Sequence, residues 1–210
     1  MLRSVQHLMR VVAPLLLVAL LAACAAQPAA TLPPKATAGT SEITVISPPQ
    51  AMTDFTLTNQ AGETVHLSDF KGKLVVLAFG YTHCPDVCPI TLARFKQIKA
   101  QLKEQAEEVE FVWISVDGAR DTPEHIRQYL NNFDPEFNGL TSDSETVRGI
   151  IGEYGGIFEL NNAGGLRKEN YTVDHTASHF LLDTEGRWIR TYAYGSEIAT
   201  IVADLKKLLA

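Results

Sequence analysis

The sequence predicts a mixed α/β domain in which buried parallel strands alternate with helices and an antiparallel strand pair follows near the end. Residues 74–80 and 109–116 form unbroken apolar runs, which are typical of strands buried on both faces of a sheet. Apolar residues recur at helical spacing after each run. Two shorter strand patterns, at 179–183 and 188–194, flank the turn Thr184-Glu185-Gly186 and indicate a hairpin.

Four helices are predicted from apolar periodicity. Pro89 suits the first turn of the first helix, and Thr122 with Pro123 begins the second. The apolar positions are Leu92, Phe95, Ile98 and Leu102, then Ile126, Tyr129, Leu130 and Phe133, then Val147, Ile150, Ile151 and Tyr154, and finally Ile198, Ile201, Val202, Leu205 and Leu208. A Gly/Asn-rich stretch at 155–172 is expected to be an inserted loop or hairpin over one end of the sheet. This order of elements is a thioredoxin-like plan.

Composition excludes several classes of protein. Hydrophobic residues make up 46% of the 210 and charged residues 20%, which is ordinary for a globular chain and unlike a disordered one. A net charge of −6 gives no reason to expect nucleic-acid binding. Three cysteines are too few for a disulfide scaffold. Their sequence contexts are therefore more informative than their number.

The N-terminal segment is typical of an exported protein. Residues 1–23 contain two arginines and no acid, and they end in an apolar run that Pro14 interrupts and that is too short to span a bilayer. The closing Leu21-Ala22-Ala23-Cys24 resembles the lipobox of bacterial lipoproteins, which implies cleavage before Cys24 and lipidation of its thiol. An uncleaved N-terminal anchor is the alternative. Either case predicts an extracytoplasmic, membrane-tethered domain.

Three regions are expected along the chain: a signal peptide at 1–23, lipidated Cys24 with a Pro/Ala/Thr-rich linker at 24–50, and one domain at 51–210. Loss of the signal peptide removes two basic and no acidic residues, so the formal charge changes from −6 to −8. An acidic domain above a membrane favours docking to a basic protein surface over contact with anionic lipid.

Two cysteines lie where the first buried strand passes into the first helix, in FGYTHCPDVCP at 79–89. Ligands gather at the carboxyl ends of strands in α/β sheets, so this is a suitable place for a site. A helix N-terminus favours the thiolate, and we expect a lowered pKa for Cys88 in particular. Thiolates bind soft metals and attack disulfides.

Four interpretations of Cys84 and Cys88 compete. A structural disulfide across so short a loop gains only about 2 kcal/mol. A dithiol reductase of the thioredoxin type has two intervening residues instead of three. A peroxidase of the peroxiredoxin type has its Thr three residues before the Cys, whereas Thr82 lies two before Cys84. Metal binding remains, but it requires a third ligand from elsewhere.

Of the six histidines, His7 is expected to leave with the signal peptide, and the other five are the candidates for that ligand. His66 and His125 are expected at the surface. His83 adjoins Cys84, and adjacent residues rarely converge on one ion. His175 and His179 remain, both in the segment that leads from the insert into the hairpin, and the residues alone do not decide between them.

The segments FGYTHCPDVCP, ISVDGARDTPEHI, FDPEFNGLT and VDHTASHFLLDTEGR occur in this order and resemble the SCO/SenC/PrrC family over roughly residues 50–210. The resemblance implies a thioredoxin-like fold with an inserted loop or hairpin, and a copper metallochaperone of cytochrome c oxidase assembly, not an enzyme. It implies one copper ion per domain, Cu(I) or Cu(II), bound by Cys84, Cys88 and His175 of the D-H-[ST] motif. His179 lies outside that motif and is a weaker candidate.

The resemblance also implies partners and alternatives. The partners are the copper-bearing subunit of the oxidase, another periplasmic copper chaperone as donor, and the membrane through the lipid anchor, with no nucleic acid. The expected location is the periplasmic side of the cell membrane. Cys84 and Cys88 are also expected to form a redox disulfide, so a thiol–disulfide reductase acting on the oxidase subunit is one alternative. A redox or copper sensor is another.

Overall fold

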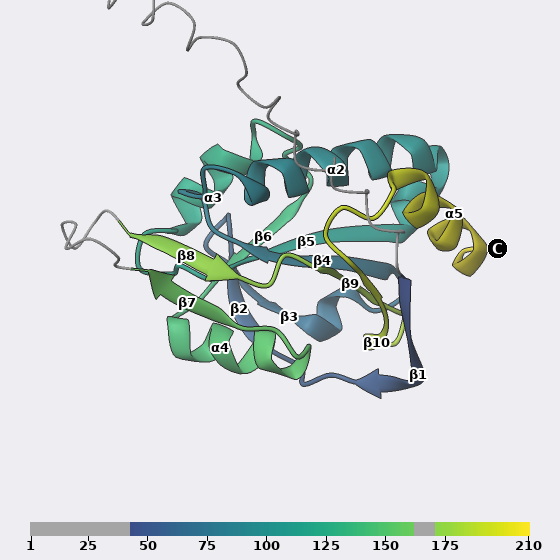
Figure 1. Ribbon diagram of the computed structural model, residues 1–210, viewed down its shortest axis with the longest axis horizontal. Helices are drawn as coiled ribbons and strands as arrows, with labels where there is room; N and C mark the ends of the chain where they lie inside the picture. Colours follow the sequence, from purple (N-terminus) through teal and green to yellow (C-terminus); the bar gives the residue numbers. More distant parts are fainter. Residues whose placement is uncertain (1–42, 162–170) are drawn as a thin grey trace, which may run out of the picture. The chain divides into compact units, whose positions relative to one another are not determined.

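The computed structural model describes residues 43–161 and 171–210 (Figure 1). Its centre is an eight-stranded mixed sheet of order β1-β10-β9-β4-β5-β6-β2-β3, beside a two-stranded sheet of β7 and β8. The strands are β1 (Ile43–Ala51), β2 (Thr56–Asn59), β3 (Thr64–His66), β4 (Leu74–Gly80), β5 (Val109–Ser115), β6 (Asn138–Thr141), β7 (Phe158–Asn161), β8 (Thr172–His175), β9 (His179–Leu182) and β10 (Arg187–Tyr192). The mixed sheet confirms the predicted α/β, thioredoxin-like class.

The central strands lie where the apolar runs predict them. All seven residues of β4 are buried, and β4 pairs in parallel with β5 from Leu74 opposite Val109 to Gly80 opposite Ser115. On its other side β4 pairs antiparallel with β9, which forms the predicted hairpin with β10. Because β4 and β5 run in the same direction, the loops that follow them leave from one edge of the sheet.

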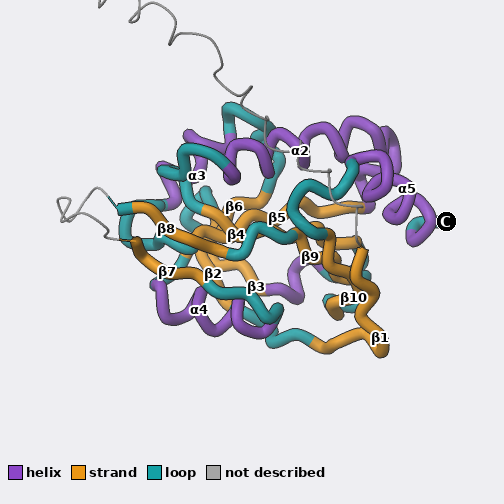
Figure 2. The backbone as a smooth tube through the Cα atoms, in the orientation of Figure 1, coloured by secondary structure: helices purple, strands orange, loops and turns teal. Residues whose placement is uncertain are grey.

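Helices cover both faces of this sheet. They are α2 (Val87–Leu102), α3 (Pro123–Leu130), α4 (Ser144–Glu153) and α5 (Ile198–Leu208), with short 3₁₀ turns η1 (Leu67–Phe70) and η2 (Lys103–Glu108). Val76 and Ala78 of β4 pack with α2, α3 and α5, whereas Leu77 and Phe79 pack with α4. Figures 1 and 2 show α2 and α5 on one side of the sheet and α4 on the other. All four helices lie at the predicted positions, although α3 ends at Leu130, before the expected Phe133.

The insert predicted at 155–172 contains a pair of strands. β7 and β8 are antiparallel, with Phe158 opposite His175 and Asn161 opposite Thr172. The connection between them, 162–170, lies outside the described residues. The pair extends beyond the predicted end of the insert, so His175 belongs to β8.

The prediction of a linker up to residue 50 is wrong for residues 43–50. These residues belong to β1, which pairs antiparallel with β10 and lies at the edge of the sheet. Pro48 and Pro49 suggested a linker, but they fall where the register shifts between Val45 and Gln50. An edge strand tolerates proline at such an irregularity because no neighbouring strand needs its missing N–H. The signal peptide, Cys24 and the rest of the linker lie outside the described residues.

Among residues 43–161 and 171–210, none of the helices has the length and apolarity needed to traverse a bilayer.

Candidate metal centre

Cys84 and Cys88 lie between β4 and the first turn of α2. Cys84 is half-buried in the loop after β4, and its N–H donates to the carbonyl of Tyr81 at 3.3 Å. Cys88 is 1% exposed, and its Sγ accepts the N–H of Tyr81 at 3.5 Å. The end of β4 and the start of α2 therefore hold the two thiols beside each other.

His175, at the end of β8, supplies a third ligand atom. Its Nε2 lies 3.3 Å from Cys88 Sγ, and the ligand atoms of Cys84, Cys88 and His175 all lie within 4.8 Å of one another. His175 Nδ1 lies 3.0 Å from the carbonyl oxygen of Thr176, which can only accept, so Nδ1 carries the proton. The lone pair of Nε2 is thus directed to the sulfur atoms, and the three side chains are positioned to bind a metal ion.

The prediction that Cys88 has the lowered pKa is wrong. A hydrogen bond from the Cys88 thiol, helped by the backbone N–H groups of Asp86 and Cys88, lowers the pKa of Cys84 to about 3 against the opposing effect of burial. The same hydrogen bond, together with burial, raises the pKa of Cys88. Cys88 is closer to the helix N-terminus, but it is buried, and a buried thiolate loses its hydration. The pair therefore shares one proton, with the thiolate on the half-exposed Cys84.

Gly80 allows the last residue of β4 to pass close to Cys88. A Cβ atom at this position would lie 2.5 Å from Trp113 Nε1 and 3.0 Å from Cys88 Sγ. The first distance is shorter than real Cβ contacts and the second is tight, so a side chain here would force Trp113 and Cys88 to shift. Nothing in the sequence indicated this contact, because Trp113 belongs to β5 and reaches Gly80 only in the folded sheet.

A cluster of side chains ties the segment before β8 to the loop after β5. Asp117 accepts hydrogen bonds from Arg120 Nε and from the Tyr171 hydroxyl, each at 2.5 Å. The Arg120 guanidinium lies 3.6 Å from the centroid of the Tyr171 ring, and it donates to the Tyr171 carbonyl at 3.0 Å. The rings of Tyr81 and His175 lie edge to face, with their centroids 6.0 Å apart. We infer that Arg120 and Tyr171 help to position β8 and its histidine; sequence analysis assigned them no role.

Asp121 holds the loop that carries Cys84. It is buried, and it accepts the Thr82 N–H at 2.9 Å, the Thr82 hydroxyl at 2.6 Å and the Ser115 hydroxyl at 2.6 Å. Burial raises the pKa of Asp121 despite these hydrogen bonds. Asp121 lies in the segment ISVDGARDTPEHI, which the sequence analysis singled out. Its contact with Thr82, 39 positions away, forms because the loops after β4 and β5 leave from the same edge of the sheet.

The weaker candidate His179 lies outside the site. Its side chain is 1% exposed. His179 belongs to β9 and stands opposite Ala78 of β4, and its ring centroid lies 5.3 Å from that of Phe95. Ala78 and Phe95 belong to the core on the α2 face, whereas Cys88 belongs to the core on the opposite face. Burial, with a smaller contribution from Arg94, lowers the pKa of His179 to about 4. As expected, His125 is exposed, whereas His66 is half-buried.

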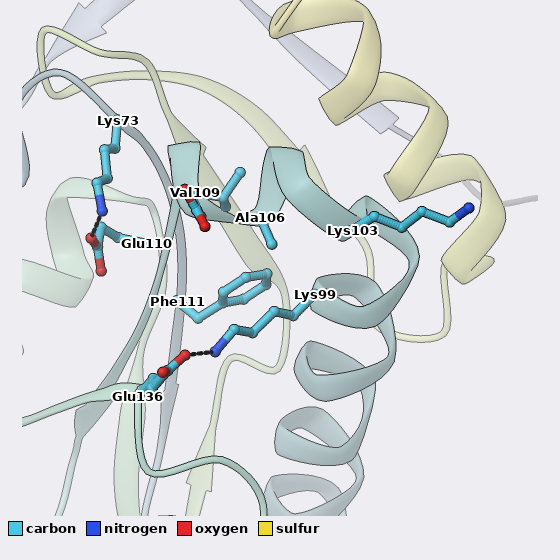
Figure 3. A pocket seen from close by; sticks show the side chains of 9 residues that line it. Lys73, Lys99, Lys103, Ala106, Val109, Glu110, Phe111 and Glu136 are labelled. Atoms are coloured by element: carbon cyan, nitrogen blue, oxygen red, sulfur yellow. Dashed lines mark hydrogen bonds and ion pairs between the residues drawn. The ribbon is translucent and has the colours of Figure 1, made fainter.

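Two hollows differ in their chemistry. One of about 370 Å³ opens beside two of the three ligands, Cys84 and His175, and is also lined by Tyr81 and Asp174, among others. A larger one of about 600 Å³ lies at the opposite end of β4 and β5 (Figure 3). In Figure 3 two ion pairs line it, Lys73 with Glu110 at 2.7 Å and Lys99 with Glu136 at 2.5 Å. It is lined by no thiol or imidazole, so the smaller hollow is the candidate site.

A thioredoxin-like domain that places two thiols and an imidazole together at the end of its sheet defines a class of metal-binding proteins. The SCO1/SenC family model matches residues 44–210, and the chain belongs to this family. It is 32% identical over 153 residues to an SCO2-like protein of Rickettsia felis, covering 73% of this chain and 74% of that protein.

Two solved structures are similar to this chain. Bradyrhizobium japonicum ScoI with copper bound is 35% identical, with 75% of this chain and 99% of that chain covered and a TM-score of 0.68. Apo Sco1 of Thermus thermophilus is 37% identical, with 79% and 95% covered and a TM-score of 0.69.

Proposed function

We propose that the protein binds one copper ion through Cys84, Cys88 and His175 and delivers it to the binuclear copper centre of a cytochrome c oxidase subunit. The observation that carries the proposal is the convergence of three ligand atoms within 4.8 Å. Family membership supports it, as do the copper-bound ScoI proteins of Bradyrhizobium japonicum, at 35% identity, and Arabidopsis thaliana, at 28%.

The donor set suits copper. Two sulfur atoms and one imidazole nitrogen favour Cu(I), which prefers soft ligands in low coordination, and such a set also supports Cu(II). Three protein ligands leave a position for a ligand from an acceptor, and the hollow beside Cys84 and His175 gives that ligand a path. Copper can then pass by exchange of ligands without release to solvent. Its acceptor would be the copper-bearing subunit, and its donor a periplasmic copper chaperone.

We also propose that the chain is anchored on the periplasmic side of the cell membrane through lipid on Cys24. The support is the sequence alone: a basic, then apolar segment that ends in a lipobox-like Leu21-Ala22-Ala23-Cys24. Mass spectrometry of the mature protein tests this, because lipidation adds acyl mass to Cys24 and cleavage of the signal peptide removes residues 1–23. A mature chain that still begins before Cys24 would contradict it.

A competitive Cu(I) titration of the full chain in detergent tests the copper site. We expect one Cu(I) per wild-type chain, and a dissociation constant that rises at least tenfold in both Cys88→Ser and His175→Ala. His66→Ala is the matched control, because His66 bonds to Thr56 and lies outside the site. Binding that survives Cys88→Ser undiminished would refute the assignment of the ligands.

A thiol–disulfide reductase is the second candidate, and the lowered pKa of the half-exposed Cys84 favours it. The Cys84 thiolate would attack a disulfide of the acceptor to form a mixed disulfide. Cys88 would then displace the acceptor thiolate, which leaves the acceptor reduced and the Cys84–Cys88 pair oxidised. His175→Ala separates the two functions. It should abolish oxidase assembly in cells if copper delivery is the function, and preserve it if reduction is.

A further inference from the structure

Two histidines that the proposed copper site does not use line another hollow. It has a volume of about 310 Å³ and is lined by Thr82, His83, His125, Gln128, Tyr129 and Asn132. His83 comes from the loop after β4, and His125 from the first turn of α3. The centroids of their rings lie 6.5 Å apart. The fold thus brings together two imidazoles that are 42 positions apart in the sequence.

Hydrogen bonds fix the tautomer of both imidazoles. His125 Nδ1 lies 2.9 Å from the carbonyl oxygen of Arg120, which can only accept, so Nδ1 carries the proton. His83 Nδ1 lies 3.0 Å from the hydroxyl of Thr82. That hydroxyl gives its own proton to Asp121 at 2.6 Å, so it accepts from His83. Both Nε2 atoms are therefore unprotonated in the neutral rings.

This arrangement is the one that metal-binding histidines adopt. A ligating imidazole usually donates its other N–H to a carbonyl or, directly or through a neighbour, to a carboxylate, which orients the ring and makes it more basic. His125 has the carbonyl, and His83 reaches the buried carboxylate of Asp121 through Thr82. Tyr129 also lines the hollow, and its buried phenol oxygen has no hydrogen-bond partner within the described ranges.

The separation of the rings suits a shared ion. Because an imidazole Nε2 binds a metal at about 2.1 Å, its ring centroid lies about 3.2 Å from the ion. If the two rings lie on opposite sides of one ion, their centroids are about 6.4 Å apart. If the angle between them at the ion is nearer to tetrahedral, the centroids are about 5 Å apart. The observed 6.5 Å needs a closure of at most about 1.5 Å. His83 and His125 are both exposed, so changes of their side-chain torsions can supply it.

We propose that His83 and His125 form a second metal site, which binds Cu(II) and is independent of Cys84, Cys88 and His175. Imidazole nitrogens with phenol or water oxygens suit Cu(II), whereas Cu(I) prefers the thiols. The site needs no thiol and does not rest on the proposed function. It lies beside the loop that carries Cys84, and it gives the chain a place for copper while the thiols are oxidised or already loaded.

Electron paramagnetic resonance of the full chain tests the proposal. In Cys84→Ser/Cys88→Ser/His175→Ala we expect one Cu(II) with hyperfine splitting from two imidazole nitrogens. Adding His83→Ala or His125→Ala should raise the dissociation constant at least tenfold and reduce the splitting to that of one nitrogen. The matched control is His66→Ala, which should leave the spectrum unchanged.

A second measurement avoids the triple substitution. Wild-type chain is first loaded with one equivalent of Cu(I), which gives no resonance signal, and is then titrated with Cu(II); the same two-nitrogen spectrum is expected. Cu(II) binding that is equal in the His83→Ala, His125→Ala and His66→Ala chains, or no binding in either experiment, overturns the proposal. Cu(I) affinity should be unchanged in His83→Ala, so a failure here is distinguishable from a failure of the thiol site.

Discussion

His179→Leu separates a core histidine from a metal ligand. The side chain is 1% exposed, and within the described part of the chain neither ring nitrogen has a hydrogen-bond partner. Burial lowers the pKa of His179 to about 4, against about 6.5 for an unperturbed histidine. Leucine is apolar and of similar volume, so the substitution removes the titrating group without opening a large cavity.

The sign and size of the effect follow from proton linkage. Well above pH 6.5 the imidazole is neutral in both the folded and the unfolded chain and adds no pH dependence. As the pH falls from 6.5 to 4, the unfolded chain binds a proton that the folded chain does not, so the folded state loses stability. Because the pKa is about 6.5 in the unfolded chain and about 4 in the folded chain, the loss reaches about 3 kcal/mol by pH 4.

Urea unfolding at pH 7.5 and pH 4 measures this loss. Other groups titrate over the same range, but they are common to both chains, so the difference between wild type and His179→Leu isolates His179. We expect the wild type to lose about 3 kcal/mol more than the variant. Equal losses in the two chains would refute the reasoning. Cu(I) affinity should be unchanged in the variant, because His179 lies on the other face of the sheet from Cys88.

Three further predictions concern the site itself. Gly80→Ala should destabilise the fold by about 1–3 kcal/mol in urea unfolding and weaken Cu(I) binding, because its Cβ would overlap Trp113 and press on Cys88. Tyr171→Phe removes the hydroxyl bound to Asp117, and it should weaken Cu(I) binding a few-fold while it lowers stability by no more than about 1.5 kcal/mol. Alkylation followed by mass spectrometry should modify Cys84 before Cys88, at a rate that hardly changes between pH 5 and 8, whereas the rate for an ordinary thiol rises several hundred-fold. Faster modification of Cys88 would contradict the assigned thiolate.

The parts of the fold that sequence predicted are those with a strong local signal. β4 has the bounds of the apolar run at 74–80, because a strand buried on both faces must be apolar throughout. β1 has no such signal: it is an exposed edge strand with two prolines, and only its pairing with β10 makes it a strand. The family motif placed Cys84, Cys88 and His175 together, and the geometry agrees.

What sequence missed in the site depends on tertiary packing. The proximity of Cys88 to a helix N-terminus is visible in the sequence, but its burial depends on the packing of other elements around it, and burial reverses the expected order of the two thiols. His179 resembles a ligand in sequence because it lies four residues from His175. Strand β9 turns its side chain into the opposite core, where it meets Phe95.

His175 comes from a different part of the fold than the two thiols. The stability of the domain and the geometry of its metal site therefore depend on different contacts. Both thiols are held by the central sheet and α2, but the imidazole comes from β8, which pairs only with β7 in the described structure. Tyr171, Arg120 and Asp117 tie the start of that strand to the end of β5. A change in these contacts should therefore weaken copper binding, whereas a change at His179 should alter the free energy of unfolding and leave copper affinity unchanged. Measuring both quantities for Tyr171→Phe and His179→Leu tests the separation; a parallel loss of stability and affinity in both variants would mean that β8 and the central sheet act as one unit.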